Sequence, residues 1–309
     1  MDFILTADNL KKQYGRYTAL DGFSIHVPRG SIYGFVGRNG AGKTTLIRII
    51  TGLQEATEGS FCLYGVENHD KRIGEARQRM GAVVESPALY LDMSAEENLR
   101  QQYRVLGIPS FDTIPELLKL VGLENTGKKT VKKFSLGMKQ RLGIAIALAG
   151  NPDFLVLDEP TNGLDPQGII ELRELILKLN RERKITVLIS SHILDELSRL
   201  ASHYGIIDKG RMIKELSAGE LHALCRKRMR VEVTDMTVLA RVLVSMALEF
   251  NILSPTQADI FAKVNITQLV LELAKEGCEI ISLETKDENL ESFFISITGG
   301  YGIEQTIDR

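Results

Sequence analysis

The chain has 309 residues, of which 44% are hydrophobic and 25% are charged. This is the composition of a globular protein and excludes disordered and fibrous classes. Its 38 Lys and Arg residues nearly balance 40 Asp and Glu residues, so a net charge of −2 gives no global electrostatic reason to bind nucleic acid or an anionic membrane. No apolar run approaches the roughly 18 residues of a membrane span. The amino terminus lacks the basic start of a signal peptide, and three widely spaced cysteines indicate a reducing cytosol.

The first two thirds of the chain have the pattern of an α/β domain. We expect strands at 3–9, 19–27, 31–37, 154–157 and 185–190, a helix at 43–51, a hairpin at 204–215, and a mainly helical segment at about 88–150. A further helix, which carries Ile169, Leu172, Ile176 and Leu179, is expected between the strands 154–157 and 185–190. Within that segment, Ser94 to Glu97 and Thr113 to Glu116 have the spacing of capping boxes, so each predicts a helix start.

The character of the sequence changes near residue 217. We expect strands at 229–235, 259–264 and 278–285, and helices at 237–249, 266–276 and 288–297. That order is typical of a small α+β domain of the split βαβ or ferredoxin-like type. The predicted domains are therefore 1–217, with its helical subdomain at about 88–150, and 218–309.

Residues 37–44 match the pattern GxxxxGK followed by Ser or Thr, between a predicted strand and a predicted helix. Such a loop turns backbone N–H groups towards a polyphosphate, and the helix N-terminus adds its positive dipole end. Lys43 is expected to reach the β and γ phosphates of ATP, and the Thr44 hydroxyl to ligate Mg²⁺. The residues that we expect around the nucleotide here are Gly37, Arg38, Asn39, Gly40, Ala41, Gly42, Lys43, Thr44 and Thr45. The alternative is a glycine-rich turn with an exposed lysine.

Two acidic residues, Asp158 and Glu159, end the apolar strand 154–157. Carboxylates near a core are costly unless they meet a cation or act chemically. Beside a phosphate loop, Asp158 is expected to coordinate Mg²⁺ and Glu159 to polarise the water that attacks the γ phosphate. The alternative is an acidic helix cap after the strand.

Several further motifs resemble those of one family. Residues 134–138, Phe-Ser-Leu-Gly-Met, resemble the LSGGQ signature of ABC transporter ATP-binding subunits, with Leu136 and Met138 where Gly and Gln are usual. Residues 163–165 resemble the D-loop of that family, His192 its switch histidine, and Tyr14 the aromatic residue that stacks on adenine. The resemblance covers about residues 1–217 and implies a P-loop NTPase cassette, with a mixed sheet core and a helical subdomain.

The resemblance also implies partners and roles. Two subunits would pair head to tail as a homodimer around two ATP molecules, at the cytoplasmic face of the membrane, with a separate membrane permease. Ser135 and Gly137 would then bind the partner's γ phosphate, Asp165 would position the partner's P-loop, and His192 would contact the γ phosphate and the attacking water. A lone histidine is more often structural, an interpretation that we keep for the other four: His26, His69, His203 and His222.

Glu85 departs from the family pattern, which has glutamine at the end of the strand before the helical subdomain, here residues 80–85. Glutamine offers a neutral carbonyl oxygen to Mg²⁺, whereas glutamate brings a charge and loses the amide donor. With Pro87 and Tyr90 after it, Glu85 resembles the loop of bacitracin-resistance and lantibiotic-immunity exporter ATPases, which implies that Glu85 contacts the nucleotide and the metal. Residues 289–300 resemble the ending of those subunits. Glu85 as a neutral substitution is the alternative.

The favoured function is therefore an ATP-hydrolysing subunit of an exporter of antimicrobial peptides. Three alternatives stay open: an export system with an unrelated substrate, an ABC ATPase that acts on nucleic acid or ribosomes, and a nucleotide-dependent binding module without turnover. A single cassette and the short distance between Lys43 and Ser135 argue against nucleic-acid types, whereas Glu159 and His192 argue against a module without turnover.

Overall fold

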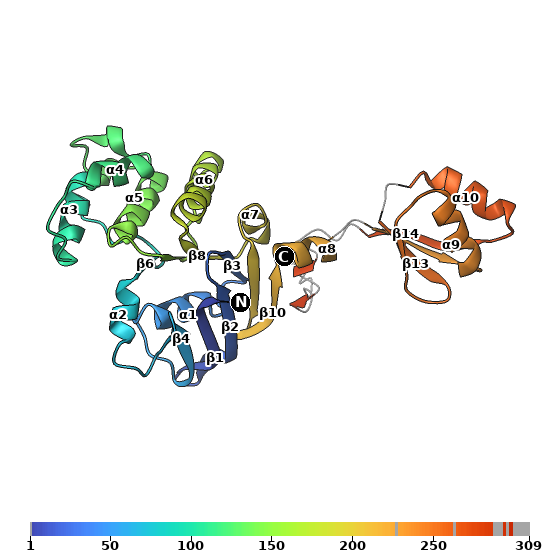
Figure 1. Ribbon diagram of the computed structural model, residues 1–309, viewed down its shortest axis with the longest axis horizontal. Helices are drawn as coiled ribbons and strands as arrows, with labels where there is room; N and C mark the ends of the chain where they lie inside the picture. The colour runs from blue at the N-terminus through green and yellow to red at the C-terminus, as the bar shows by residue number, and fades with distance from the viewer. Residues whose placement is uncertain (1, 226–227, 262–263, 287–292, 295–296, 299–309) are drawn as a thin grey trace, which may run out of the picture. The chain divides into compact units, whose positions relative to one another are not determined.

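The computed structural model describes residues 2–225, 228–261, 264–286, 293–294 and 297–298. The chain divides into two compact units, Met1–Ala218 and Gly219–Arg309. Unit 1 contains two sheets and the helices that carry the candidate site, and unit 2 contains one sheet. Figure 1 shows the course of the chain through both units.

The first sheet of unit 1 is antiparallel, with the strand order β2-β1-β4-β5. Its strands are β1 (Phe3–Tyr14), β2 (Tyr17–Pro28), β4 (Glu58–Leu63) and β5 (Val66–Glu67). β1 and β2 are longer than expected, because the polar residues Lys12 and Gln13 continue the hairpin opposite Leu20 and Thr18. Register shifts within this pair break the alternation of apolar and polar residues, which hid the strand ends from the sequence pattern.

The second sheet has six strands in the order β10-β9-β3-β8-β7-β6. They are β3 (Ile32–Gly37), β6 (Met80–Val83), β7 (Phe154–Leu157), β8 (Thr186–Ser191), β9 (His203–Asp208) and β10 (Arg211–Ser217). All neighbours are parallel except β9 and β10. β3, β7 and β8 are buried along their whole length, as in a sheet covered on both faces. Their carboxyl ends lie at one edge, which brings the phosphate loop, the acidic pair and His192 together.

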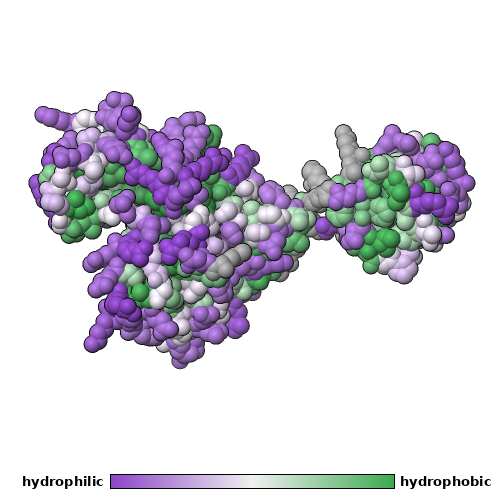
Figure 2. All heavy atoms as spheres, viewed as in Figure 1, coloured by the Kyte–Doolittle hydropathy of each residue, from purple (hydrophilic) through white to green (hydrophobic). Residues whose placement is uncertain are grey.

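Seven helices belong to the described part of unit 1. They are α1 (Lys43–Ile50), α2 (Ile73–Gln78), α3 (Ala95–Val105), α4 (Ile114–Leu120), α5 (Leu136–Leu148), α6 (Pro166–Arg183) and α7 (Leu194–Ser198), with short 3₁₀ turns at Glu124–Thr126 and Val131–Lys133. Figure 1 shows α3, α4 and α5 (green) on the opposite side of β6 from β1, β2 and β4 (blue). The surface over α3 and α4 in Figure 2 is mostly hydrophilic.

Only one of the two predicted capping boxes forms. Ser94 accepts a hydrogen bond from the Glu97 backbone, and the Glu97 carboxylate accepts one from the Ser94 backbone. The box at Thr113 is wrong, because Thr113 is in the helical conformation and its side chain makes no capping bond. Its hydroxyl lies 2.8 Å from the Tyr103 hydroxyl instead, so a tertiary hydrogen bond between α3 and the start of α4 takes its place.

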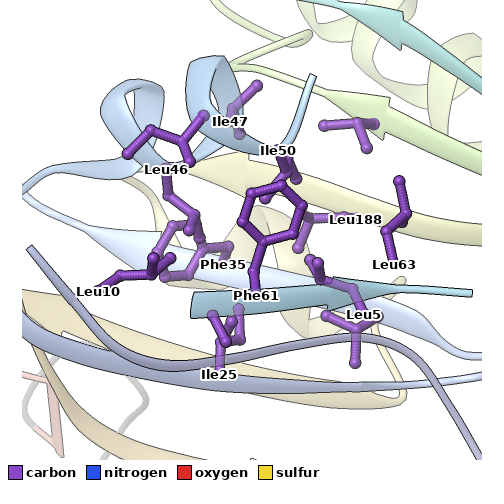
Figure 3. Close-up of a cluster of buried hydrophobic side chains, with 14 of the residues drawn as sticks. Leu5, Leu10, Ile25, Phe35, Leu46, Ile47, Ile50, Phe61, Leu63 and Leu188 are labelled. Atoms are coloured by element: carbon purple, nitrogen blue, oxygen red, sulfur yellow. The ribbon is translucent and has the colours of Figure 1, made fainter. Parts of the chain in front are cut away.

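The core of unit 1 joins its two sheets through α1. Figure 3 shows Leu46 and Ile50 of this helix close to Phe61 of β4 and Phe35 of β3. These side chains are almost fully buried, so their removal from water is a main source of stability. The packing fixes α1 directly behind the phosphate loop.

Unit 2 begins with α8 (Ala218–Leu224), whose first residue belongs to unit 1. The helices and strands that follow are β11 (Arg228–Val233), α9 (Met236–Ser245), β12 (Phe250–Ile252), β13 (Gln257–Ile260), α10 (Ile266–Lys275) and β14 (Ile280–Lys286). The antiparallel sheet has the order β12-β13-β11-β14, and the order of elements from β11 to β14 is that of a ferredoxin-like unit. The strand β12 was missed because it is short and half exposed. The predicted helix at 288–297 and the segment 289–300 lie outside the described residues, apart from 293–294 and 297–298.

Candidate nucleotide-binding site

The phosphate loop connects the end of β3 to the start of α1. Gly42 is the residue before α1 and has φ of 112°, and a Cβ there would lie 2.7 Å from the Ala19 carbonyl oxygen. Only glycine therefore fits this position. The Lys43 side chain is 5% exposed, and its Nζ donates hydrogen bonds to the carbonyl oxygens of Gly37 (2.6 Å) and Arg38 (3.2 Å). The loop forms a pocket lined by Tyr17, Asn39, Gly40, Gly42, Lys43, Thr44, Thr45 and Glu159.

Asp158 is buried at the end of β7 and is tied to β8 by a serine. Ser190 Oγ donates to Asp158 Oδ1 at 2.6 Å and accepts a hydrogen bond from the Glu159 backbone N–H at 2.8 Å. The second oxygen, Asp158 Oδ2, is buried and has no hydrogen-bond partner among the described residues. A buried carboxylate oxygen without a partner is costly unless a cation or a ligand reaches it.

Glu159 lies between two cations or potential cations. Its Oε1 is 3.0 Å from Lys43 Nζ, and its Oε2 is 2.8 Å from His192 Nδ1. The backbone of Glu159 has φ of 47°, a left-handed conformation that is uncommon for a residue other than glycine. The carboxylate is thus held at the mouth of the phosphate loop by residues from α1 and from the end of β8.

Two tyrosines, Tyr14 and Tyr17, pair with each other at the turn between β1 and β2. The Tyr14 hydroxyl contacts Gln54 Oε1, and the Tyr14 side chain is half exposed. Tyr17 lines the pocket, and its hydroxyl donates to the Gly40 carbonyl oxygen at 3.3 Å. The contact of Tyr14 with adenine, which the sequence pattern indicated, stays a prediction. Tyr17 is a second aromatic residue, beside the phosphate loop, that the pattern missed.

The signature and D-loop residues lie side by side in unit 1. Ser135 is the N-cap of α5 and accepts a hydrogen bond from Met138 N at 3.2 Å, while Asp165 is the N-cap of α6 and accepts one from Gly168 N at 3.1 Å. Leu136 approaches Gly163 so closely that a Cβ on this glycine would lie 3.1 Å from Leu136 Cδ2. A half-exposed leucine at the usual glycine position therefore packs against the D-loop.

Glu85 is not among the residues that line the phosphate pocket. Its carboxylate pairs with the Arg48 guanidinium in the last turn of α1, and its backbone has φ of 60°. The structure therefore gives this predicted metal ligand a protein partner, and no group of three or more His, Cys, Asp or Glu side chains in the described ranges is placed to hold a metal.

Three residues of this region were missed by sequence reasoning: Ser190, Tyr17 and Arg48. Ser190 had a signal, because it is the second-last residue of a fully buried strand, and the neighbouring strand in the sheet leads directly to Asp158. Arg48 had none, because its partner is 37 residues away in the chain.

Comparison with known proteins agrees with this geometry. The family profile described as "ABC transporter" matches residues 20–162. The bacitracin transport ATP-binding protein BcrA of Bacillus licheniformis is 40% identical over 97% of this chain and 99% of its own length. The lantibiotic transport ATP-binding protein SrtF of Streptococcus pyogenes is 47% identical over 69% of this chain and 90% of its own.

Solved structures give the same answer for the fold. The dimeric structure of MJ0796, a bacterial ABC transporter cassette, superposes with a TM-score of 0.62 at 25% identity, over 69% of this chain and 98% of that one. This confirms the predicted mixed-sheet cassette. Relatives that align over nearly the whole chain confirm the family that the motifs indicated. The protein belongs to the ABC transporter family, as an ATP-binding subunit.

Proposed function

We propose that this subunit hydrolyses ATP and that Glu159 acts on the attacking water. The observation that carries the proposal is the position of the Glu159 carboxylate, between Lys43 of the phosphate loop and His192 after β8. A carboxylate within reach of the γ phosphate can orient a water molecule and accept its proton. His192 would hold that carboxylate and contact the γ phosphate.

The residues also fit a magnesium ion. Thr44 lines the phosphate pocket, and Asp158 has a buried oxygen for which the described residues provide no partner. These two side chains would hold Mg²⁺, which supplies positive charge to the phosphates. Ser190 fixes the other oxygen of Asp158 and so orients the carboxylate. Glu85 would join this metal site only after leaving Arg48.

Dimerisation would complete each site. Ser135 and Gly137 lie at the first turn of α5, where the backbone N–H groups and the helix dipole favour an anion. We propose that they bind the γ phosphate held by a second copy, with Asp165 placed against the P-loop of that copy. The dimeric form of the similar cassette MJ0796 supports this arrangement.

The cassette would drive export through a separate permease at the cytoplasmic face of the membrane. None of the helices in the described residues is long and apolar enough to cross a bilayer. The names of the similar proteins, bacitracin transport and lantibiotic transport, support an antimicrobial peptide as the cargo. Purification of the chain with its membrane partner, followed by export assays with both peptide classes, tests this assignment. Transport of an unrelated substrate alone would contradict it.

The Glu159→Gln variant tests the catalytic proposal. The amide keeps the size of the side chain but cannot accept a proton, so we expect ATP binding to persist and hydrolysis to fall by about 10²- to 10⁴-fold. An ATP-stabilised dimer should accumulate, which size-exclusion chromatography with ATP detects. Turnover at the wild-type rate would remove Glu159 from this role.

A further inference from the structure

Helix α1 provides a cation to each of two glutamates from different parts of unit 1. Lys43 in its first turn pairs with Glu159, and Arg48 in its last turn pairs with Glu85. The two pairs differ in exposure. The Lys43 side chain is buried, whereas the side chains of Arg48 and Glu85 are 37% and 56% exposed. The first pair lies in the phosphate pocket, and the second lies at the opposite end of the helix.

Glu85 begins a segment that enters the helical subdomain. Two residues before it, the Val83 carbonyl oxygen accepts a hydrogen bond from Asp158 N at 2.9 Å, so the start of the segment is tied to the site. Two residues after it, Pro87 packs on Gly143 of α5, where a Cβ would lie 2.6 Å from Pro87 Cβ and Cγ. Glu85 therefore lies between the catalytic edge of the sheet and the helix that begins at the signature.

The rest of the segment is attached to the chain before that signature. Asn98 of α3 donates to the Tyr90 carbonyl oxygen at 3.0 Å, and its amide oxygen accepts from Tyr90 N at 2.8 Å. The carbonyl oxygens of Leu91 and Met93 accept hydrogen bonds from Lys132 N and Val131 N. A displacement of residues 84–93 would thus move the chain leading to Ser135. Among the described residues, the ion pair between Arg48 and Glu85 is a side-chain contact that joins residues 84–87 to α1.

Charge gives a physical reason for the pair. Glu85 adds a negative charge to the edge that already carries Asp158 and Glu159, and a bound nucleotide adds more. Arg48 offsets that charge without occupying the phosphate pocket, because its guanidinium approaches from the last turn of α1. The left-handed backbone at Glu85 is an uncommon conformation, which needs such external contacts to persist.

From these contacts we propose that Arg48 is a positioning residue, which holds Glu85 through an ion pair and thereby ties the nucleotide-bearing helix α1 to residues 84–93. The pair couples the position of α1 to that of the helical subdomain, and so to the signature at the start of α5. This inference rests on the proposed ATPase function for its kinetic consequences, whereas the tie itself consists of the ion pair between Arg48 and Glu85.

The test uses the full chain and a charge-reversal cycle. The variants are Arg48→Ala, Glu85→Gln, the double variant of these two, and the exchange of charges Arg48→Glu with Glu85→Arg. Arg100→Ala is the matched control, because Arg100 forms a similarly exposed ion pair, with Glu96 at 2.7 Å, within helix α3. Amide hydrogen exchange of residues 84–93 without nucleotide, ATP affinity, kcat and KM are measured for each.

We expect exchange of residues 84–93 to become about two- to five-fold faster in Arg48→Ala and in Glu85→Gln, the range that an exposed ion pair supports. The double variant should add little to either single one, because each single variant already abolishes the same ion pair. ATP affinity and KM should stay within a few-fold while kcat falls, and the charge exchange should recover part of both losses. The control should leave all four quantities unchanged.

Independent, additive effects of the two single variants would overturn the proposal, as would unchanged exchange in Arg48→Ala or no recovery in the charge exchange. Failure of the proposed ATPase function is distinguishable from these outcomes. A wild-type protein that binds ATP without turnover contradicts that function, while the exchange measurements still decide whether the pair holds the segment.

Discussion

Ser190 shows how one hydroxyl group can organise two candidate site residues. It is fully buried, donates to Asp158 Oδ1 and accepts from the Glu159 backbone. Because the same oxygen is both donor and acceptor, the serine fixes the carboxylate of one residue and the backbone of the next. The residue at the end of β8 is thus part of the geometry at the end of β7.

Ser190→Ala should destabilise the fold by roughly 1–3 kcal/mol, because Asp158 Oδ1 loses its buried donor. It should also lower ATPase activity, since the loss frees both Asp158 and the Glu159 backbone. Thermal unfolding and steady-state ATPase assays measure the two effects. Ser31→Ala is the control: Ser31 is also buried, but its hydroxyl donates to the Pro28 carbonyl oxygen. Equal losses of activity in both variants would show that Ser190 acts through stability alone.

At the scale of single residues, sequence reasoning identified the site residues that belong to contiguous motifs. It missed the residues that join the site only through contacts in space. Lys43, Asp158 and Glu159 could be identified because the pattern around each is local. Arg48 could not, because an arginine on the polar side of a short helix has no distinctive spacing. Glu85 shows the intermediate case, since its position was singled out but its partner in the protein was not.

The stability of a helix in the helical subdomain depends on the residues that cap its ends. The capping box at Ser94 and Glu97 satisfies two backbone N–H groups at the start of α3. Hydrogen bonds from the Ser94 backbone and then from its side chain lower the pKa of Glu97. A carboxyl group whose pKa is lower in the folded state contributes stability above its unfolded pKa and loses that contribution as the pH falls through the folded value.

Glu97→Gln should therefore be less stable than the wild type at neutral pH, because the amide keeps an acceptor oxygen but loses the charge. The difference should shrink as the pH falls below the ordinary range of a glutamate and vanish below the folded pKa of Glu97. Chemical unfolding at a series of pH values measures it. Glu96→Gln, which leaves the box intact, controls for the general effect of removing an acid from the first turn. A difference that persists at acid pH would contradict the argument.

Element boundaries were predicted well where one physical signal dominates. The strand Phe154–Leu157 matches its prediction because a run of apolar residues is bounded by polar ones on both sides. Helix α9 ends at Ser245 rather than near residue 249, because the backbone of Ala247 takes a left-handed φ of 54°. An alanine followed by a leucine gives no sequence signal for this conformation. The strands β4 and β6 gave a weaker pattern than β3 and β7, because they include exposed and half-exposed residues whereas β3 and β7 are buried throughout.

Within the described residues, each unit has a hydrophobic core of its own. The core shown in Figure 3 draws its residues from positions 4–212, and the core of unit 2 from positions 229–283. A unit that buries its own apolar surface has its own source of stability. Sequence reasoning placed a change of character near residue 217 because the pattern of strands and helices starts anew there. In the structure, the boundary between the two compact units follows Ala218.

A chain that ends at Ala218 should fold and bind ATP within a few-fold of the affinity of the full chain. This end point keeps β10 whole, because Ser217 pairs with His203 and Ala218 N donates to the Ser202 carbonyl oxygen at 2.8 Å. All residues that line the phosphate pocket, and all candidate site residues, lie before it. Circular dichroism and equilibrium binding of a labelled ATP analogue measure folding and affinity, with Lys43→Ala in the shortened chain as the negative control. A shortened chain that folds but does not bind ATP would show that unit 2 is required for the nucleotide site.

A shortened chain that binds ATP but no longer supports export with its permease would assign unit 2 to a later step, after nucleotide binding.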